Sequence, residues 1–339
     1  MKAPTRALIA LFSAGGFAFA TDYAYDLGVR AAQNGNNQEA IKQFTQAIRV
    51  DPNHTKAYFG RGLAYADLND TSKAIVDYTQ AIKIDPKFAD AYGGRGFAYY
   101  NLGNYSKAIV DFTKAIEIDP NNAYAYGARG DAYNGLGDTS KAIADYTQAL
   151  KIDPKFAEAY YNRGLAYANL GDTSKAIADY TQALKIDPKL AEAYNNRGFA
   201  YDSLGDTSKA IADYTQAIKI DPNYANAYNN RGNAYADLGD TSKAIADWTQ
   251  AIKIDPNYAD AYNNRGNTYN KLGDHKQAIA DYTQALKIDP KLAAAYNNRA
   301  VAYYILGDYK SATKDARKAC ELGDCKFLQY LGENKLLRD

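Results

Sequence analysis

The sequence predicts an all-α fold: an α-α superhelical solenoid of about nine 34-residue helix-turn-helix repeats with a C-terminal capping helix. The first observation is a strict period of 34 residues between prolines, which indicates stacked repeats rather than one compact core. The second is that each period holds two segments with helical spacing of apolar residues and no strand-like alternation. The periodic prolines are Pro52, Pro86, Pro120, Pro154, Pro188, Pro222, Pro256 and Pro290.

Residues 1–20 have the pattern of a cleavable signal peptide. Lys2 and Arg6 precede an apolar stretch that ends in Ala18-Phe19-Ala20, a small-residue cleavage pattern. The alternative is a membrane anchor, but this stretch of about 14 residues is shorter than the ~20 residues that span hydrocarbon. We therefore expect export to a periplasmic or extracellular location, with no membrane insertion after removal of the signal.

Each repeat is predicted to be a helical hairpin, as residues 191–224 illustrate. Two clusters of small and apolar residues have the spacing of amphipathic helices. The first contains Tyr194, Gly198, Tyr201 and Leu204, and the second contains Ala210, Ile211, Tyr214, Ala217 and Ile218. The repeating tyrosines are thus mostly assigned to the core, where small residues face them.

Turn residues mark the ends of these helices. Gly205 suits the left-handed residue that ends the first helix, and Asp206 or Thr207 can cap the second. At the end of the repeat, Asp221 and Pro222 predict an N-cap followed by proline in the first turn of the next helix.

These residues resemble the tetratricopeptide repeat family. The family's small or aromatic landmarks match Tyr194, Gly198, Tyr201, Ala210, Tyr214, Ala217 and Pro222 in this repeat. The resemblance covers about nine tenths of the chain and implies a non-enzymatic scaffold for protein interactions. Nine units fit the pattern: 21–54, 55–88, 89–122, 123–156, 157–190, 191–224, 225–258, 259–292 and 293–326, which together span 21–326.

The ninth unit departs from the pattern, with Ala316 in place of the large aromatic residue and Asp324 in place of proline. Such changes are expected in a terminal repeat, whose outer face needs a cap. Residues 327–339 are rich in leucine and are predicted to contribute the capping helix. Cys320 and Cys325 flank Gly323, and in an oxidising compartment we expect a local disulfide that fixes this cap.

An arginine occupies the seventh position of eight repeats, where the family often has leucine. A buried guanidinium needs an acid beside it, and an aspartate follows sixteen residues later in every case. In the first repeat Leu27 and Gln43 replace both charges together. The sequence therefore predicts structural ion pairs, with an anion-binding row as the alternative and with the remaining guanidinium donors on backbone carbonyls. The central pairs are Arg163 with Asp179, Arg197 with Asp213, and Arg231 with Asp247.

Asparagines dominate the positions that the family resemblance assigns to the concave groove in the later repeats. Asparagine carries an acceptor and two donors, so a row could hold the backbone of an extended peptide. This arrangement is similar to the asparagine ladder in the solenoid of eukaryotic N-acetylglucosamine transferases. The alternative is that these amides solvate the helices or bond to neighbouring turns. The predicted binding residues are Asn162, Asn195, Asn196, Asn229, Asn230, Asn233, Asn263, Asn264, Asn267, Asn297 and Asn298.

The early repeats differ, because smaller or apolar residues occupy the same groove positions. They include Phe59, Gly60, Gly93, Gly94, Gly127 and Ala128. The groove is therefore predicted to be smoother in its N-terminal half and lined with amides in its C-terminal half.

Composition argues against several other functions. Forty basic residues against 39 acidic ones leave no positive excess for a phosphate backbone, so no nucleic acid is expected as a partner. His54 and His275 lie seven repeats apart, so we expect no catalytic site, metal or cofactor. The leading hypothesis is a scaffold that binds a protein or extended peptide. The alternatives are a carbohydrate-binding solenoid that uses Tyr100, Tyr161 and Tyr304, or a passive spacer in an envelope assembly.

Overall fold

The computed structural model describes residues 14–334, with side chains from Thr21 onward. Over this range the chain contains nineteen α-helices and no strand, and it divides into unit 1 (Met1–Leu170) and unit 2 (Gly171–Asp339). Residues 1–13 of the predicted signal peptide and residues 335–339 of the predicted cap lie outside the described range.

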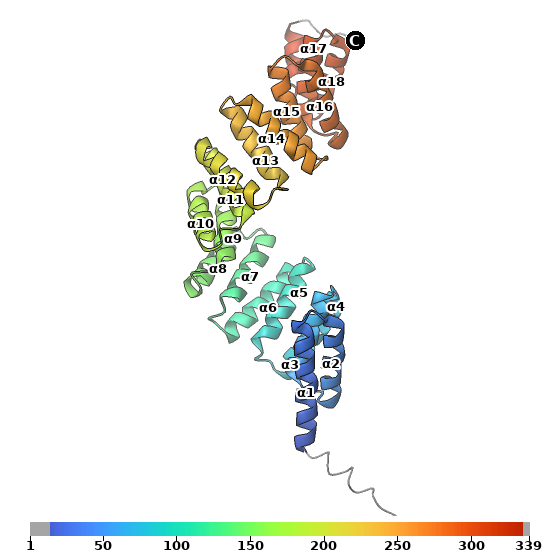
Figure 1. Cartoon of the computed structure of the whole chain (residues 1–339), viewed down its shortest axis with the longest axis vertical. Coiled ribbons are helices and arrows are strands. Elements are labelled where there is room, and N and C mark those ends of the chain that lie inside the picture. Colours follow the sequence, from blue (N-terminus) through green and yellow to red (C-terminus); the bar gives the residue numbers. More distant parts are fainter. Residues whose placement is uncertain (1–13, 335–339) are drawn as a thin grey trace, which may run out of the picture. The chain divides into compact units, whose positions relative to one another are not determined.

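The helices follow one another as short hairpins in each unit (Figure 1). Unit 1 contains α1 (Ala14–Gln33), α2 (Asn37–Val50), α3 (Thr55–Asp67), α4 (Thr71–Ile84), α5 (Ala89–Asn101), α6 (Tyr105–Ile118), α7 (Ala123–Gly135), α8 (Thr139–Ile152) and α9 (Ala157–Asn169). Unit 2 contains α10 (Thr173–Ile186), α11 (Ala191–Ser203), α12 (Thr207–Ile220), α13 (Ala225–Asp237), α14 (Thr241–Ile254), α15 (Ala259–Lys271), α16 (His275–Ile288), α17 (Ala293–Ile305), α18 (Tyr309–Glu321) and α19 (Lys326–Glu333).

Packing in both units is local. Within each unit a helix packs on the helices before and after it in the chain, and the first helices of successive repeats also touch, as α3 and α5 or α11 and α13 do. The predicted all-α solenoid of helix-turn-helix repeats is confirmed. No described helix is both long and apolar enough to cross a membrane.

The turn inside each hairpin matches its prediction. Gly205 has φ +80°, which ends α11 in the left-handed region that glycine adopts without steric cost. Asp206 then caps α12, because its side chain accepts a hydrogen bond from the backbone N–H of Lys209 at 3.2 Å.

The turn between repeats corrects a prediction. The helix that follows Asp221 and Pro222 begins at Ala225, so neither residue caps or starts it. Instead, the carboxylate of Asp221 accepts a hydrogen bond from the backbone N–H of Asn223 at 2.9 Å. An aspartate that bonds its own backbone two residues on forms an Asx turn, and the fixed φ of proline suits the turn as well as a helix.

In the repeat at residues 191–224 the core is an aromatic ring against a glycine. Tyr214 of α12 is almost fully buried, and a Cβ atom added to Gly198 of α11 would lie 2.9 Å from its ring. Glycine is therefore required there for the two helices to approach. Phe44, Phe112 and Trp248 take the place of this tyrosine in three other repeats, so the core tolerates any large ring.

The two ends of the solenoid differ from its middle. Helix α1 begins at Ala14, inside the predicted signal peptide, and continues without interruption into the first repeat. At the other end, α19 buries Leu331 against Ala300 and Ala316, so it covers the last core face as a cap. A disulfide joins Cys320 to Cys325 just before this helix.

Candidate binding groove

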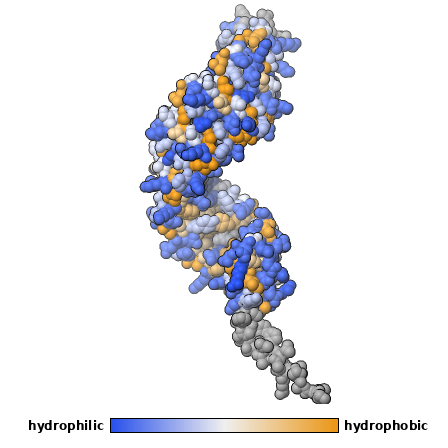
Figure 2. All heavy atoms as spheres, in the orientation of Figure 1, coloured by the Kyte–Doolittle hydropathy of each residue, from blue (hydrophilic) through white to orange (hydrophobic). Residues whose placement is uncertain are grey.

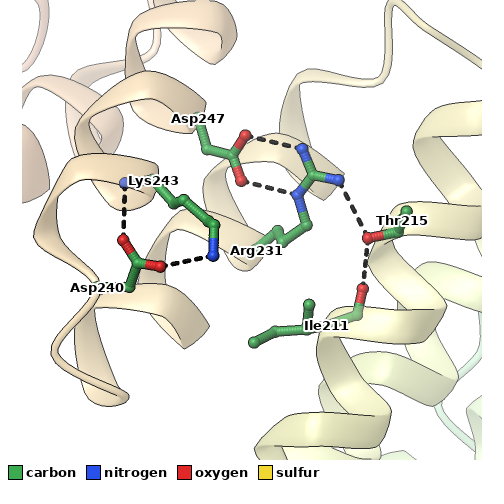
Figure 3. A network of polar contacts seen from close by, with 6 residues as sticks. All are labelled: Ile211, Thr215, Arg231, Asp240, Lys243 and Asp247. Carbon is green, nitrogen blue, oxygen red and sulfur yellow. Dashed lines mark hydrogen bonds and ion pairs between the residues drawn. The ribbon is translucent and has the colours of Figure 1, made fainter.

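The arginine row is part of a network that ties repeats together (Figure 3). Arg231 donates from Nε and one terminal nitrogen to both carboxylate oxygens of Asp247, at 2.7 and 2.8 Å. Its other terminal nitrogen donates to Thr215 Oγ1 of the preceding repeat at 3.0 Å. The threonine hydroxyl in turn donates to the carbonyl of Ile211. The remaining donor thus reaches a threonine hydroxyl and not the backbone carbonyl that was predicted.

The same bidentate contact recurs in both units. It is present in Arg61 with Asp77, Arg95 with Asp111, Arg129 with Asp145, Arg197 with Asp213, Arg265 with Asp281, and Arg299 with Asp315. The predicted pair of Arg163 with Asp179 lies across the division between the units and stays a prediction. Arg163 itself donates to Thr147 at 3.0 Å.

The contacts of the arginine network stabilise the fold. The Arg197 guanidinium lies 5.5 Å from the centre of the Tyr194 ring and 5.9 Å from that of Tyr201, within cation–π range. The Arg197 side chain is only 16% exposed and that of Asp213 only 9%, so the paired charges are mostly removed from water. Hydrogen bonding to Asp213 is the main cause that raises the pKa of Arg197. A charge neutralised in this way offers little to an external anion.

The asparagines of unit 2 form a continuous chain of amide hydrogen bonds. Within a repeat, Asn229 donates from Nδ2 to Oδ1 of Asn230 at 3.4 Å. Between repeats, Asn230 donates to Asn195 at 3.1 Å and Asn264 donates to Asn229 at 3.4 Å. The chain, which we call the amide ladder, consists of Asn298, Asn263, Asn264, Asn229, Asn230, Asn195 and Asn196.

The side chains of the amide ladder use much of their hydrogen-bonding capacity on one another. Asn195, Asn229 and Asn263 are buried, and their neighbours at the next position are partly exposed. Several of the ladder bonds are 3.3–3.5 Å long, beyond the usual range for N–H···O contacts. Asn229 and Asn230 each keep a second N–H and a second lone pair for other partners, whereas Nδ2 of Asn264 already donates to both Asn229 and Asn233. The ladder therefore joins repeats and still presents polar groups to the groove.

The remaining predicted asparagines have individual partners. Asn233 Oδ1 accepts from Trp248 Nε1 at 3.1 Å and from Asn264 Nδ2 at 3.0 Å, and Asn267 Oδ1 accepts from Tyr282 at 2.8 Å. Asn297 Nδ2 donates to Asp324 at 3.3 Å, while the side-chain oxygen Oδ1 of Asn297 is buried without a hydrogen-bond partner.

Unit 1 has a hollow where unit 2 has the ladder. A cavity of about 630 Å³ lies along α3, α5 and α7, and its lining includes the predicted groove residues Phe59, Gly93 and Gly94 together with core rings such as Phe112. Phe59 and Phe97 form apolar walls, and Gly93 leaves open space above its backbone. Tyr124 is 57% exposed and Leu63 is 43% exposed at its rim. Figure 2 shows hydrophobic residues interspersed with hydrophilic ones on the face that it draws.

A second, smaller cavity of about 70 Å³ shares the walls of Phe97 and Tyr124 and contains Asp131 of α7. Asp131 Oδ1 accepts hydrogen bonds from the Tyr146 hydroxyl at 2.7 Å and from Asn162 Nδ2 at 2.9 Å. Burial is the main cause that raises the pKa of this carboxyl, and the nearby charge of Glu158 raises it further.

Sequence reasoning missed Asp131. It occupies the ninth position of its repeat, where the other repeats carry an apolar residue or asparagine. That departure from the period was the available signal. By contrast, two tyrosines proposed for carbohydrate stacking pack on other rings, with centroids 5.3 Å apart for Tyr100 and Tyr105 and 5.2 Å apart for Tyr304 and Tyr309.

Comparison with solved structures identifies related folds. A tetratricopeptide repeat protein from Parabacteroides merdae is similar with a TM-score of 0.56 at 22% identity, over 71% of this chain and 95% of its own. The APC/C hetero-tetramer Cut9-Hcn1 gives a TM-score of 0.55 at 17% identity, over 89% of this chain and 73% of the other. YrrB, a TPR protein with an unusual peptide-binding site, gives a TM-score of 0.47 at 26% identity, over 54% and 95%.

No curated protein matches the chain significantly. Three family models do. A TPR repeat model matches residues 30–69, 62–103, 130–171, 201–239 and 232–273. Two tetratricopeptide repeat models match residues 89–122, 157–190 and 259–292, and residues 112–144, 179–212 and 281–314. With more than half of its residues matched and its helices arranged as hairpins, this chain belongs to the tetratricopeptide repeat family.

Proposed function

We propose that the protein is a non-enzymatic interaction scaffold that binds an extended segment of a partner protein in its concave groove. The observation that carries this proposal is the cavity of about 630 Å³ in unit 1, because residues from the first helices of three successive repeats line it. Phe59, Phe97 and the exposed ring of Tyr124 would bury an apolar side chain. Cavities of this size with apolar walls are typical of ligand sites.

The amide ladder would contribute the second part of the interaction. The bonds that Asn230 and Asn264 accept from Asn229 and Asn263 are long, at 3.4 and 3.5 Å, so the amide oxygens of Asn230 and Asn264 could instead accept hydrogen bonds from the backbone of a bound peptide. Such contacts do not distinguish one peptide side chain from another. Unit 1 would therefore supply selective contacts, and the amides of unit 2 would supply contacts that accept many sequences.

The proposed place of action is outside the cytoplasm. The basic residues, short apolar stretch and Ala18-Phe19-Ala20 of the N-terminal segment support an export signal. The disulfide of Cys320 with Cys325 fits an oxidising compartment such as the periplasm or the extracellular space.

The test is selection of displayed random ten-residue peptides on the purified full chain, followed by affinity measurement with synthetic copies. Gly93→Leu would place a side chain in the open cavity, where an added Cβ meets no atom within 4 Å. Leucine also favours a helix over glycine by about 0.8–1 kcal/mol, so the variant should remain folded. We expect its peptide affinity to fall at least about tenfold, a loss of about 1.4 kcal/mol.

Two controls complete this design. Ala144→Leu adds the same side chain on an exposed face of α8 outside the cavity and should bind as the wild type does. A triple variant with Asn196, Asn230 and Asn264 changed to alanine measures the contribution of the amide ladder. If no peptide is enriched, or if Gly93→Leu binds as tightly as the wild type, the proposed groove is wrong. Binding to a glycan array in that case would favour the carbohydrate alternative.

A further inference from the structure

Asp131 carries a charge that its structural role does not require. Its Oδ1 accepts one hydrogen bond from the ring residue fifteen positions later and one from the asparagine thirty-one positions later. Asn233 accepts the equivalent pair of bonds from Trp248 and Asn264, and it does so as a neutral amide. The hydrogen-bonding role at this position is therefore fulfilled without a charge elsewhere in the same chain. The negative charge at residue 131 needs another explanation.

No cation compensates this charge within the described part of the chain. Both hydrogen-bond donors to Asp131 are neutral, and the charged group that affects it most is another acid, Glu158. The aspartates of the ion pairs are different, since Asp111 and Asp145 each bind an arginine through both oxygens. A partly buried carboxylate without a counter-ion costs folding free energy. It is complementary to a cation that arrives with a ligand.

The walls of the small cavity suit an organic cation rather than a metal ion. The ring centroids of Phe97 and Tyr124 are 5.2 Å apart, and those of Tyr124 and Phe156 are 6.2 Å apart. Aromatic rings attract ammonium and guanidinium groups, whereas Ca²⁺ and Mg²⁺ require a shell of oxygen ligands. Among the described residues, no group of three or more His, Cys, Asp or Glu side chains could hold a metal ion.

Size and position point to a side chain of a longer ligand. A cavity of about 70 Å³ has room for several water-sized atoms, enough for the head group of lysine or arginine. It shares Phe97 and Tyr124 with the larger cavity, so a chain in the groove could place one side chain in each.

We propose that the small cavity around Asp131 binds a lysine or arginine side chain of the peptide held in the groove, with Asp131 and Glu158 as its charge partners and Tyr124 and Phe156 beside its head group. This inference rests on the proposed function and adds the chemical class of the recognised segment. The segment is extended, with a basic residue close to an apolar one.

The same displayed library of ten-residue peptides tests this inference. The wild-type full chain should enrich peptides with a lysine or arginine near an apolar residue. Asp131→Asn should show a weaker preference, because Glu158 alone remains as a charge partner. For a selected peptide, replacing lysine by the uncharged norleucine should weaken wild-type binding about ten- to hundredfold. The same replacement should have a smaller effect on Asp131→Asn, because only Glu158 remains as a charge partner.

The outcomes separate the inference from the proposed function. Enriched peptides without a basic preference would overturn the cation site and leave the groove proposal intact. Enrichment of no peptide would overturn both. Equal norleucine losses in the wild type and in Asp131→Asn would also overturn the cation site. Asn233 shows that an amide serves the structural role, and Glu158→Gln, at an exposed residue, provides a second charge-removing variant that should not affect folding.

Discussion

The two units have the same scaffold, but different residues occupy their groove positions. In unit 1 the groove positions carry glycine and aromatic residues, and they leave an apolar cavity with a carboxylate beside it. In unit 2 the same positions carry asparagines that bond to one another across repeats. The arginine network is the same in both. The repeated residues thus determine how helices stack, and the few residues that vary determine what the surface can bind.

The largest effect should come from breaking the shared scaffold. Asp111→Ala in unit 1 and Asp213→Ala in unit 2 each leave a mostly buried arginine without its carboxylate. We expect each change to lower the free energy of unfolding by about 3–5 kcal/mol. Urea denaturation followed by circular dichroism measures this. Unequal losses would show that the two scaffolds are not equivalent.

The first repeat supplies a matched control for that experiment. Leu27 and Gln43 occupy the positions of arginine and aspartate there. The double variant R197L/D213Q copies this solution into unit 2 and removes both charges together. It should recover most of the stability that Asp213→Ala loses, because no charge remains unpaired. No recovery would mean that packing, rather than the unpaired charge, causes the loss.

A smaller loss of stability is expected when the amide ladder of unit 2 is interrupted. Asn230→Ala removes the donor to Asn195 and the acceptor of Asn229, two residues that are buried. Leaving both groups unsatisfied should cost about 1–3 kcal/mol in the same urea measurement. Asn226→Ala, at an exposed position of the same helix α13, should change stability little. Equal losses in the two variants would show that the ladder does not join the repeats.

The smallest effect concerns the sign of the pH dependence at Asp131. Burial and Glu158 raise its pKa, while the bonds from Tyr146 and Asn162 lower it. Tyr100 also faces this charge. Because the folded state binds the proton more tightly than the unfolded state, the ionised form lowers stability above the folded pKa. As pH falls from that pKa towards about 3.9, the ordinary value for aspartate, this cost should disappear.

Asp131→Asn should therefore be slightly more stable than the wild type at pH 7, with the difference decreasing on acidification. Urea denaturation of both proteins at pH 7 and pH 4 measures the difference. Asn233→Asp, the reverse change in unit 2, should lower stability at pH 7. If Asp131→Asn were instead less stable at pH 7 and equal at pH 4, the carboxylate would have a stabilising partner and the unpaired-charge argument would be wrong.

The sequence predicts features that depend on one repeat and misses those that depend on two. The Gly205 turn, the Asp206 cap and the pairing of Arg197 with Asp213 lie within one repeat, so periodic spacing predicts them. The bond from Arg231 to Thr215 and the amide ladder join neighbouring repeats, and their geometry depends on how the hairpins stack. A periodic pattern contains no such distances.

Two other failures have different physical causes. Aspartate before proline can cap a helix or close an Asx turn, and the local sequence around Asp221 does not distinguish the two. Asp131 occurs in one repeat alone, so a periodic pattern does not predict it. The residues that differ between repeats were the better guide to the site, since the shared ones serve the scaffold.

The spacing of the arginine network also has a consequence for how such a gene can change. Each arginine, such as Arg231, finds one partner sixteen residues ahead and another sixteen residues behind. Duplication or deletion of one 34-residue segment by recombination between near-identical repeats would restore every such set of partners. Copy number could therefore change without creating an unpaired buried charge. Duplication of the segment that carries Asp131 would instead copy a recognition feature, so array length and ligand preference can evolve separately.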